Sequence, residues 1–398
     1  MTKAAILGYG TIGSGVYEVL TENRDIVSGN AGDDIEVKYI LDLRDFPGDP
    51  AEKILTHDFN DILNDKEVSI VCETMGGTGA AYKFSKAALE AGKSVVTSNK
   101  AVVAAYGPEL LQIAKEKNVS YLFEASVGGG IPILRPLVEC VTADRIEEIT
   151  GILNGTTNYI LTKMYNEGSA FEPTLKEAQA LGYAEKDPTA DIEGADCCRK
   201  IAILSSLANK QFVNFEKIDC TGITKITDAD TAFAKTLGRK IKLVGSYKKI
   251  EGKSYAEVSP VLMGKDNPLY NVDDVMNAIL VKGNMLGDVM FYGAGAGKRP
   301  TASAVVSDIV DIVRNKGKNI PTFQMAPEEV KLENMGDLKS RYYIRAQKSE
   351  AFLKAFPKTL SLSEYPSDCV ALTGDLTAAE LSERTSKIPD IKNVLKIF

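Results

Sequence analysis

The fold of this chain is decided by the stretch AAILGYGTIGSGVYEVL, residues Ala4–Leu20. Its apolar start, Ala4–Leu7, predicts a short buried strand, and its end predicts a helix. Between them lies the pattern G-x-G-x-x-G, formed by Gly8, Gly10 and Gly13. Glycines permit a tight turn and a close approach of the backbone, and a helix N-terminus offers free N–H groups with a partial positive charge. The pattern alone also fits an ordinary glycine-rich turn, but directly after the first strand it predicts a pyrophosphate site.

Further strands and helices alternate along the next hundred residues. Strands are predicted at Glu36–Leu41, Val68–Cys72, Ser94–Thr97 and Ser120–Glu124, and helices around Tyr82–Ala91 and Pro108–Lys117. This alternation predicts an α/β domain with a Rossmann-type, doubly wound parallel sheet. Ligands of such sheets bind beyond the carboxyl ends of the strands. Gly76 and Lys100 lie at such ends, so Gly76 should contact a dinucleotide and Lys100 its nicotinamide. The alternative for Lys100 is an ordinary solvated lysine at a helix start.

The end of the second strand bears on the choice of dinucleotide. Asp42 could accept a hydrogen bond from an adenosine ribose, which favours NAD. Arg44 follows two residues later and could pair with a 2′-phosphate, which favours NADP. The sequence leaves both cofactors open.

After Pro132 the pattern changes to that of a second, α+β domain. Strands are predicted at Arg145–Leu153, Ile218–Gly222, Lys240–Tyr247 and Tyr255–Leu262, and helices at Leu134–Val141, Thr157–Glu167, Thr174–Leu181, Ala190–Ala208, Asp228–Leu237 and Thr301–Val313. The last helix should return to the first domain. The motif GILNGTTNYIL places Gly155 and Thr156 at a helix start, where backbone and hydroxyl donors suit a carboxylate. An ordinary helix cap explains this motif equally well.

The segment GYAEKDPTADIEGADCCRK, Gly182–Lys200, concentrates charge at the entrance of an apolar helix. Its five carboxylates would be costly to bury without a role. Asp196 and Lys200 are four residues apart, so they share one helix face. We interpret them as a proton-transfer pair, because lysine can act as a base when burial or a second cation lowers its pKa. A surface salt bridge is the alternative. The remaining charged side chains are predicted to be solvated: Lys186, Asp187, Glu193 and Arg199.

Composition restricts the class of protein. The chain has 398 residues, 44% of them hydrophobic and 25% charged, which predicts two or three globular domains. A net charge of −7 gives no support to nucleic-acid or membrane binding, and no apolar run is long enough for a membrane span. Six scattered cysteines and the lack of a signal peptide predict a reducing cytoplasm. The single histidine, His57, is predicted to be a surface residue away from every motif.

The C-terminal part of the chain follows a different pattern. Residues 319–339 are predicted to be a linker because the region is polar and contains prolines and glycines. Beyond it, strands are predicted at Arg341–Gln347, Thr359–Leu362, Cys369–Thr373 and Val394–Phe398, with helices at Ser349–Ala355 and Thr377–Ser386. This order, βαββαβ, is typical of a ferredoxin-like domain. The predicted limits are therefore 1–132 with about 303–318 for the dinucleotide domain, 133–302 for the second domain and 340–398 for the third.

Several motifs together resemble the homoserine dehydrogenase family. They are GYGTIG, TSNKA, EASVGGGIPI, GILNGTTNYIL, GYAEKDPTADIEGADCCRK and GAGAGKRPTASAVVSD, in the family's order, and they cover roughly residues 1–315. The C-terminal segment, beginning SRYYIRA, is similar to the ACT domain of many members. It lacks the usual Asp-x-Pro-Gly turn, so a threonine-binding regulatory domain and a degenerate domain kept for subunit contacts both remain open.

The resemblance implies reversible oxidation of L-homoserine to L-aspartate 4-semialdehyde with NAD(P)⁺, a step of threonine and methionine biosynthesis. A neutral lysine would take the hydroxyl proton. Carried over by position, the cofactor loop comprises Gly8, Gly10, Thr11, Ile12 and Gly13. The catalytic residues are Lys100, Asp196 and Lys200, and the substrate-binding residues are Gly155, Thr156, Tyr183, Glu185 and Asp191. A monovalent-cation site for Na⁺ or K⁺, formed by one carboxylate and backbone carbonyls, matches Glu124, Val127, Gly129 and Ile131.

The resemblance also implies a cytoplasmic enzyme with a small-molecule substrate, which forms a homodimer or a higher homo-oligomer. Two alternatives remain. One is an NAD(P)-dependent oxidoreductase on the same fold that acts on another amino acid or its semialdehyde. The other is a non-catalytic sensor that binds a nucleotide and an amino acid.

Overall fold

The computed structural model describes residues 1–316 and 323–398, and these divide into two compact units. The first unit comprises Met1–Arg145, Ala202–Phe215 and Gly293–Val330, and the second comprises Ile146–Ile201, Glu216–Tyr292 and Lys331–Phe398. The domain limits predicted from the sequence remain predictions. Of the predicted linker, residues 319–322 lie outside the described residues. The rest of it contains regular structure: strands β14 (Ala326–Glu329) and β15 (Leu332–Glu333) and a 3-10 turn at Met335–Asp337.

The first unit contains the predicted parallel sheet. Its six strands follow the order β3-β2-β1-β4-β5-β6, and every pair between them is parallel. The strands are β1 (Thr2–Leu7), β2 (Ile35–Leu41), β3 (Leu55–Thr56), β4 (Val68–Glu73), β5 (Ser94–Thr97) and β6 (Tyr121–Leu122). Their nearly continuous burial explains the apolar runs in the sequence, since helices cover both faces of such a sheet.

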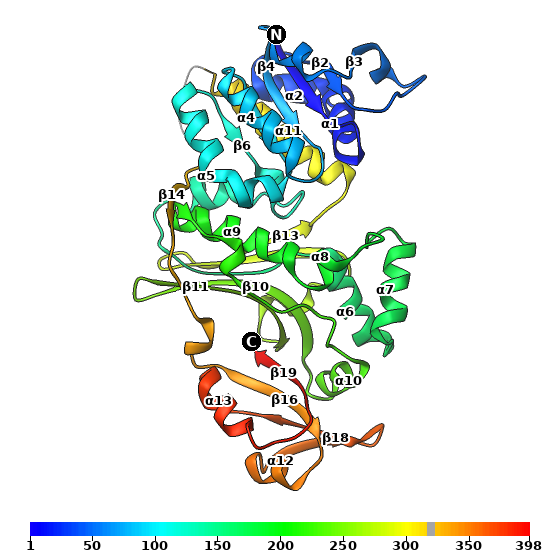
Figure 1. Cartoon of the computed structure of the whole chain (residues 1–398), viewed down its shortest axis with the longest axis vertical. Helices are drawn as coiled ribbons and strands as arrows, with labels where there is room; N and C mark the ends of the chain where they lie inside the picture. Colours follow the sequence, from blue (N-terminus) through cyan, green and yellow to red (C-terminus); the bar gives the residue numbers. More distant parts are fainter. Residues whose placement is uncertain (317–322) are drawn as a thin grey trace. The chain divides into compact units, whose positions relative to one another are not determined.

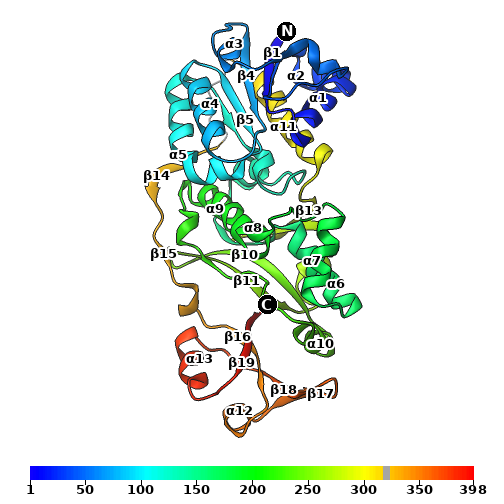
Figure 2. The ribbon, with the colours of Figure 1, turned by 45° about the vertical axis from the view of Figure 1, so that its right-hand side comes forward.

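Helices lie on both faces of this sheet, with α4 and α5 on one side and α1, α2 and α11 on the other (Figure 2). They are α1 (Thr11–Glu22), α2 (Arg24–Ala31), α3 (Phe59–Leu63), α4 (Gly79–Glu90), α5 (Lys100–Lys117) and α11 (Lys298–Arg314), and a short π-helix spans Pro136–Cys140. Val305 and Ile309 of α11 share one core with Val16 and Leu20 of α1, so the late helix returns to this unit as predicted. Helices α2 and α3 were not predicted: α2 is mostly polar, and α3 has only five residues.

The second unit is built on a mixed sheet in the order β13-β12-β7-β10-β11-β19-β16-β18-β17. The strands before the C-terminal segment are β7 (Ile146–Ile152), β9 (Asp219–Cys220), β10 (Lys240–Ile250), β11 (Lys253–Met263), β12 (Met276–Gly283) and β13 (Gly287–Ala294). Strands β12 and β13 were not predicted. A separate two-stranded sheet pairs β8 (Gln211–Phe212) with β14 in the first unit.

The helices of this region are α6 (Gly155–Glu167), α7 (Phe171–Ala180), α8 (Thr189–Ile192), α9 (Ala195–Asn209) and α10 (Asp228–Thr236). The single helix predicted over Ala190–Ala208 is wrong, because it is divided into α8 and α9. Gly194 separates them with a φ of +86°, a left-handed conformation that other residues rarely adopt. A side chain there would also lie 2.9 Å from the Cys220 sulfur.

The C-terminal segment has the predicted element order βαββαβ (Figure 1). Its elements are β16 (Arg341–Gln347), α12 (Glu350–Ala355), β17 (Thr359–Leu362), β18 (Tyr365–Leu372), α13 (Ala378–Thr385) and β19 (Ile391–Ile397). Strand β19 pairs with β11 through Val261 and Leu262, so these four strands continue the main sheet of the second unit. That the segment is an ACT-like domain remains a prediction.

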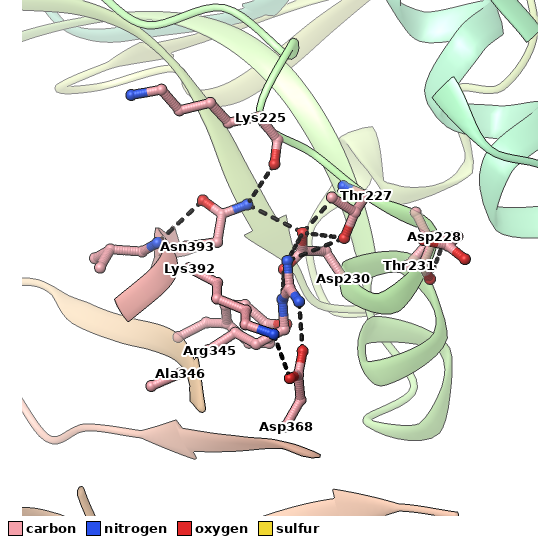
Figure 3. Close-up of polar contacts among 12 residues, drawn as sticks. Lys225, Thr227, Asp228, Asp230, Thr231, Arg345, Ala346, Asp368, Lys392 and Asn393 are labelled. Carbon is pink, nitrogen blue, oxygen red and sulfur yellow. Dashed lines mark hydrogen bonds and ion pairs between the residues drawn. The ribbon is translucent and has the colours of Figure 1, made fainter. Parts of the chain in front are cut away.

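A buried ion-pair cluster joins this segment to α10 (Figure 3). The Arg345 guanidinium donates to both oxygens of Asp230, at 2.7 and 3.0 Å, and to Asp368 at 2.6 Å. The side chains of Arg345, Asp230 and Asp368 are only 6%, 0% and 4% exposed. Lys392 and Asn393 add further bonds to Asp368 and Asp230. Such a cluster depends on every partner, because each charge is removed from water.

Within the described residues, no helix is both long and apolar enough to cross a membrane. All six cysteines are free thiols, as their scattered positions predict.

Candidate active site

The glycine loop has the geometry that a pyrophosphate requires. Gly8 has a φ of +90°, and a side chain at Gly13 would lie 1.9 Å from the Gly8 carbonyl oxygen. By contrast, a side chain at Gly10 would meet nothing within 4 Å. Gly10 is also the N-cap of α1, and no side chain among the described residues caps that helix end. The N–H groups of Thr11 and Ile12, the first residues of α1, are therefore available to an anion.

A cavity of about 520 Å³ adjoins this loop. It is lined by Gly8, Gly10, Leu41, Asp42, Leu43, Arg44, His57, Phe59, Thr74, Met75, Gly76, Ala80 and Phe84. Gly76, which is predicted to contact a dinucleotide, is among these residues. The lining combines apolar and aromatic side chains with a few polar groups, which is typical of a cofactor pocket.

The Asp42 carboxylate in this cavity is fully engaged by hydrogen-bond donors. It accepts from the Tyr9 backbone N–H at 2.7 Å and from three N–H groups of Arg44 at 2.9 to 3.0 Å. The Arg44 guanidinium holds the pKa of Asp42 well below its usual range. Arg44 itself is 61% exposed, so its guanidinium can reach a ligand at the cavity rim.

His57 also lines this cavity, although its sequence position suggested a residue away from every motif. That prediction is wrong in one respect: the ring is exposed, but its Nδ1 lies 2.6 Å from the Asp42 carbonyl oxygen. This contact raises the pKa of His57. Strand β3 was not predicted. It pairs with β2 and places His57, the residue after β3, beside the carboxyl end of β2.

Lys100 is the first residue of α5 and is half-buried. The preceding residue, Asn99, caps the helix by accepting from the N–H groups of Ala101 and Val102. Asn99 also donates to the Gly77 carbonyl oxygen at 2.7 Å. The turn that carries Lys100 is therefore tied to the loop that carries Gly76.

Glu124 is a buried carboxylate in the predicted cation loop. Its two oxygens accept three backbone N–H groups, those of Ile133, Leu134 and Arg135, at 2.7 to 2.8 Å. The Glu124 backbone N–H donates to Asp308, which also contacts the Arg135 guanidinium. Burial raises the pKa of Asp308 to about 8 and also raises that of Glu124. The nearby turn contains Val127, Gly129 and Ile131, and Gly129 has a φ of +55°.

In the second unit, Lys200 and Asp196 form a buried pair on α9. The Lys200 ammonium lies 2.8 Å from the Asp196 carboxylate and donates to the Leu153 carbonyl oxygen at 2.7 Å. The side chains are only 9% and 3% exposed, so the alternative of a surface salt bridge is wrong. Burial makes this pair far stronger electrostatically than an exposed i,i+4 pair.

Asn154, which the sequence analysis did not single out, organises this site. Its amide nitrogen donates to Asp191 at 2.8 Å and to Asp196 at 2.9 Å. Its amide oxygen accepts from the backbone N–H of Thr157 and so caps α6. The sequence signal was present, since an asparagine before Gly-Thr-Thr at a helix start is a typical N-cap.

The remaining substrate-binding candidates lie beside α6. A side chain at Gly155 would lie 2.8 Å from the Val275 carbonyl oxygen, which explains the glycine there. The Thr156 hydroxyl donates to the Tyr183 carbonyl oxygen at 2.5 Å. Tyr183 is 44% exposed and its ring packs edge-on against Tyr159. Glu185 lies on the exposed loop that follows.

The charged residues predicted to be solvated mostly are. Lys186, Asp187 and Glu193 are exposed, and Asp187 accepts from the backbone N–H and the hydroxyl of Thr189. Arg199 is an exception, because it is half-buried.

The structure thus groups the predicted site residues in two sets. The first unit brings together the glycine loop, Asp42, Arg44 and Gly76 around one cavity. The second unit brings together Asp191, Asp196 and Lys200 through Asn154. Lys100 belongs to the first unit and Lys200 to the second. Within the described residues, no group of three or more His, Cys, Asp or Glu side chains is arranged to hold a metal ion.

Comparison with known proteins gives a consistent result for both parts of the chain. Residues 8–124 match the family model "Homoserine dehydrogenase, NAD binding domain", and residues 132–310 match the model "Homoserine dehydrogenase". The chain is 42% identical over 352 residues to homoserine dehydrogenase of Neisseria gonorrhoeae, covering 86% of this chain and 81% of that protein. It is 40% identical over 349 residues to the Bacillus subtilis enzyme, covering 86% and 80%.

Solved structures agree with this assignment. A homoserine dehydrogenase from Thiobacillus denitrificans superposes with a TM-score of 0.91 at 36% identity, covering 100% of this chain and 98% of that one. A hyperthermophilic archaeal homoserine dehydrogenase in complex with NADPH gives a TM-score of 0.67 at 31% identity, covering 78% and 97%. This chain therefore belongs to the homoserine dehydrogenase family.

Proposed function

We propose that this chain catalyses the reversible, NAD(P)-dependent interconversion of L-homoserine and L-aspartate 4-semialdehyde. When it is bound, the nicotinamide exchanges hydride with the carbon that bears the substrate oxygen. The observation that carries the proposal is the buried Lys200, held by Asp196 and the Leu153 carbonyl oxygen. Homologues named homoserine dehydrogenase cover most of the chain and support the same substrate.

Lys200 is proposed to move the proton. A lysine ammonium has three N–H donors, and two of them have partners here. The third can donate to the aldehyde oxygen of the semialdehyde and deliver a proton as that oxygen becomes a hydroxyl. In the oxidation direction the neutral amine takes the same proton back. Asp196 holds the amine in position, and Asn154 fixes Asp196. Lys100 is proposed as the second active-site lysine.

The substrate's amino-acid end is assigned to the exposed face beside α6. Glu185 is proposed to hold the ammonium with the help of Tyr183, since an exposed carboxylate is available there. Gly155 and Thr156 are proposed to face the carboxylate, because they begin α6, where backbone N–H groups favour an anion. Asp191 completes the polar surface.

We further propose that the enzyme prefers NADP to NAD. The Asp42 carboxylate accepts four hydrogen bonds, two of them from the Arg44 guanidinium, so a ribose hydroxyl would have to displace that guanidinium to reach Asp42. The exposed Arg44 guanidinium can turn to a 2′-phosphate, for which a planar fork of N–H donors is well suited.

A monovalent cation is proposed to bind the loop that follows Glu124. Its ligands would be the backbone carbonyl oxygens of Val127, Gly129 and Ile131, which suit Na⁺ or K⁺ as hard ions. The Glu124 carboxylate is already occupied by three N–H donors, so in this proposal it orders the loop. Replacing Na⁺ and K⁺ with a bulky organic cation should lower activity; unchanged activity would remove the cation from the proposal.

A homodimer is proposed through the open edge of the large sheet. Strand β13 is the terminal strand of that sheet, and its side chains alternate in exposure. Met290 and Tyr292 on it are 41% and 54% exposed. An apolar edge strand is a place where a second copy can pair. Light scattering after size exclusion would reveal a monomer if the proposal is wrong.

The activity is tested by following NADPH absorbance with homoserine and, in reverse, with aspartate semialdehyde. Lys200→Met should lower kcat by orders of magnitude while NADPH still binds, as measured by its fluorescence. Lys186→Ala is the matched control, because this lysine is exposed on the same segment. Normal turnover by Lys200→Met, or no turnover of homoserine by the unaltered chain, would contradict the proposal.

A further inference from the structure

Glu73, the last residue of β4, is a buried carboxyl group that the proposed chemistry does not use. Its exposed fraction is 0%, and burial raises its pKa to about 7. One oxygen accepts from the Met75 backbone N–H at 2.8 Å, and the other is 2.6 Å from the Thr97 hydroxyl. A buried carboxyl group is costly, so two short, fixed bonds indicate a specific role.

The hydrogen bonds continue from Thr97 to the start of α5. The Thr97 hydroxyl oxygen accepts from the Asn99 N–H at 2.9 Å. The Asn99 side chain caps α5, whose first residue is Lys100, and donates to Gly77. Glu73 therefore stands at the junction of the strand end, the loop through Gly77 and the turn before Lys100.

Both segments that Glu73 holds have tasks in the proposed reaction. Met75 and Gly76 line the cavity assigned to the dinucleotide, and Lys100 is the proposed second active-site lysine. Met75 lies close to the glycine loop: a side chain at Gly8 would come within 2.9 Å of it. A shift of the Met75 backbone would therefore disturb both the glycine loop and the Met75–Gly76 loop, which line the cavity assigned to the dinucleotide.

We propose that Glu73 is a positioning residue, which fixes the Met75–Gly77 loop and the Thr97–Lys100 turn in their catalytic geometry. The proposal rests on the proposed function, because that function gives the two segments their tasks. Tyr121 of β6, two strands from β4 in the sheet, interacts with this carboxyl group electrostatically: it is buried, and its pKa is raised by burial and by the Glu73 charge.

The direction of the Glu73–Thr97 bond depends on protonation. The Thr97 hydroxyl has one hydrogen, which it donates to Glu73 when the carboxylate is charged. When Glu73 is protonated, the carboxyl O–H can donate to Thr97 instead, and the Thr97 hydrogen must find another acceptor. The direction of the Glu73–Thr97 bond therefore reverses near neutral pH while Thr97 still accepts from Asn99, and loop order should change with this reversal.

Two substitutions distinguish the effect of the Glu73 hydrogen bonds from the effect of its charge. Glu73→Gln keeps the size and hydrogen bonds of the protonated form but cannot ionise, whereas Glu73→Ala removes both bonds. We expect Glu73→Ala to weaken NADPH binding and to lower kcat, each by about tenfold, as the loss of one or two buried hydrogen bonds implies. Glu73→Gln should bind NADPH as tightly as the unaltered chain does below about pH 7, where Glu73 is protonated. The control is Glu67→Gln, since Glu67 is 60% exposed in the same unit.

The decisive measurement is the dissociation constant of NADPH, by fluorescence titration, as a function of pH between about 5.5 and 9. His57, which lines the same cavity, and the 2′-phosphate of NADPH titrate in this range too, but they are the same in both proteins. The unaltered chain should therefore show a step near neutral pH in addition to the pH dependence that Glu73→Gln retains. Identical pH dependence in Glu73→Gln and the unaltered chain, or unchanged affinity in Glu73→Ala, would overturn the proposal.

If Glu73→Ala does not fold, Thr97→Val against Thr97→Ser tests the same relay. Valine should weaken NADPH binding and serine should preserve it, and equal affinities would overturn the proposal. Turnover of homoserine by the unaltered chain tests the proposed function separately, so the two hypotheses can fail independently.

Discussion

Replacing Arg345 with methionine should destabilise the second unit by about 3 kcal/mol. The guanidinium donates four hydrogen bonds, two to Asp230, one to Asp368 and one to Thr227, at 2.6 to 3.0 Å (Figure 3). Removing one partner of a buried ion pair typically costs about 3–5 kcal/mol, because the other charge is left without compensation.

The lower end of that range applies here because the carboxylates keep other donors. Asp230 still accepts from the Tyr343 hydroxyl and the Asn393 amide, both at 3.1 Å. Asp368 still accepts from Lys392 at 2.6 Å. Methionine also replaces much of the apolar stem of arginine, which limits the cavity.

The assay is urea unfolding followed by far-ultraviolet circular dichroism, with hydrogen exchange of β16 and α10 to locate the change. The control is Arg24→Met: Arg24 lies 3.5 Å from Asp34, and their side chains are 61% and 50% exposed. Such a pair contributes at most about 1 kcal/mol. Adding Asp230→Asn to Arg345→Met should recover part of the loss, since it removes the uncompensated charge. If Arg345→Met costs no more than Arg24→Met, the reasoning about burial is refuted.

Three further predictions concern the first unit. Gly10→Ala should leave stability unchanged but weaken NADPH binding, because only a bound ligand would meet the new methyl group. Gly13→Ala should instead destabilise the fold, because its methyl group would lie 1.9 Å from the Gly8 carbonyl oxygen. Equal urea midpoints for the two variants would contradict this. Arg44→Ala should lower kcat/KM for NADP by about 10- to 100-fold while that for NAD changes little, and an equal loss with both nucleotides would count against the proposed phosphate contact. Burial raises the pKa of Glu73 from 4.5 to about 7, so the folded state binds the Glu73 proton more tightly than the unfolded state does. The stability that this proton contributes is fully present below about pH 4.5 and is lost as the pH rises through 7. Glu73→Gln should remove this decline, which amounts to about 3 kcal/mol, and urea midpoints with the same slope against pH as the unaltered chain would refute the assignment.

Elements with a strong local pattern could be predicted from the sequence. Strand Ser94–Thr97 has the predicted limits, and the last helix returns to the first unit as expected, because contiguous or periodic apolar residues reflect burial directly. The glycine loop was equally predictable, since its backbone demands are local. A single helix over Ala190–Ala208 was predicted wrongly, because Gly194 interrupts it with a left-handed backbone, and a side chain at that position would contact Cys220.

The candidate site was predicted only in part. The four-residue spacing of Asp196 and Lys200 gave their common face, but a surface pair and a buried pair have the same spacing. Asn154 was missed because its two carboxylate partners lie 37 and 42 residues further along the chain. His57 was misjudged because a two-residue strand, too short for a sequence pattern, brings it to Asp42.

The family and the dinucleotide motif could be identified from the sequence, because each depends on residues that are close together in the chain. Which charged groups are buried, and which are paired, follows from contacts between distant segments. Burial depends on residues far away in sequence, and it is burial that converts a carboxylate or a lysine from a solvated charge into a group with a fixed partner and a defined direction. The glycine loop could thus be predicted from the sequence. The hydrogen bonds from Glu73 to the turn before Lys100, and the ion pairs around Arg345, form only in the folded chain.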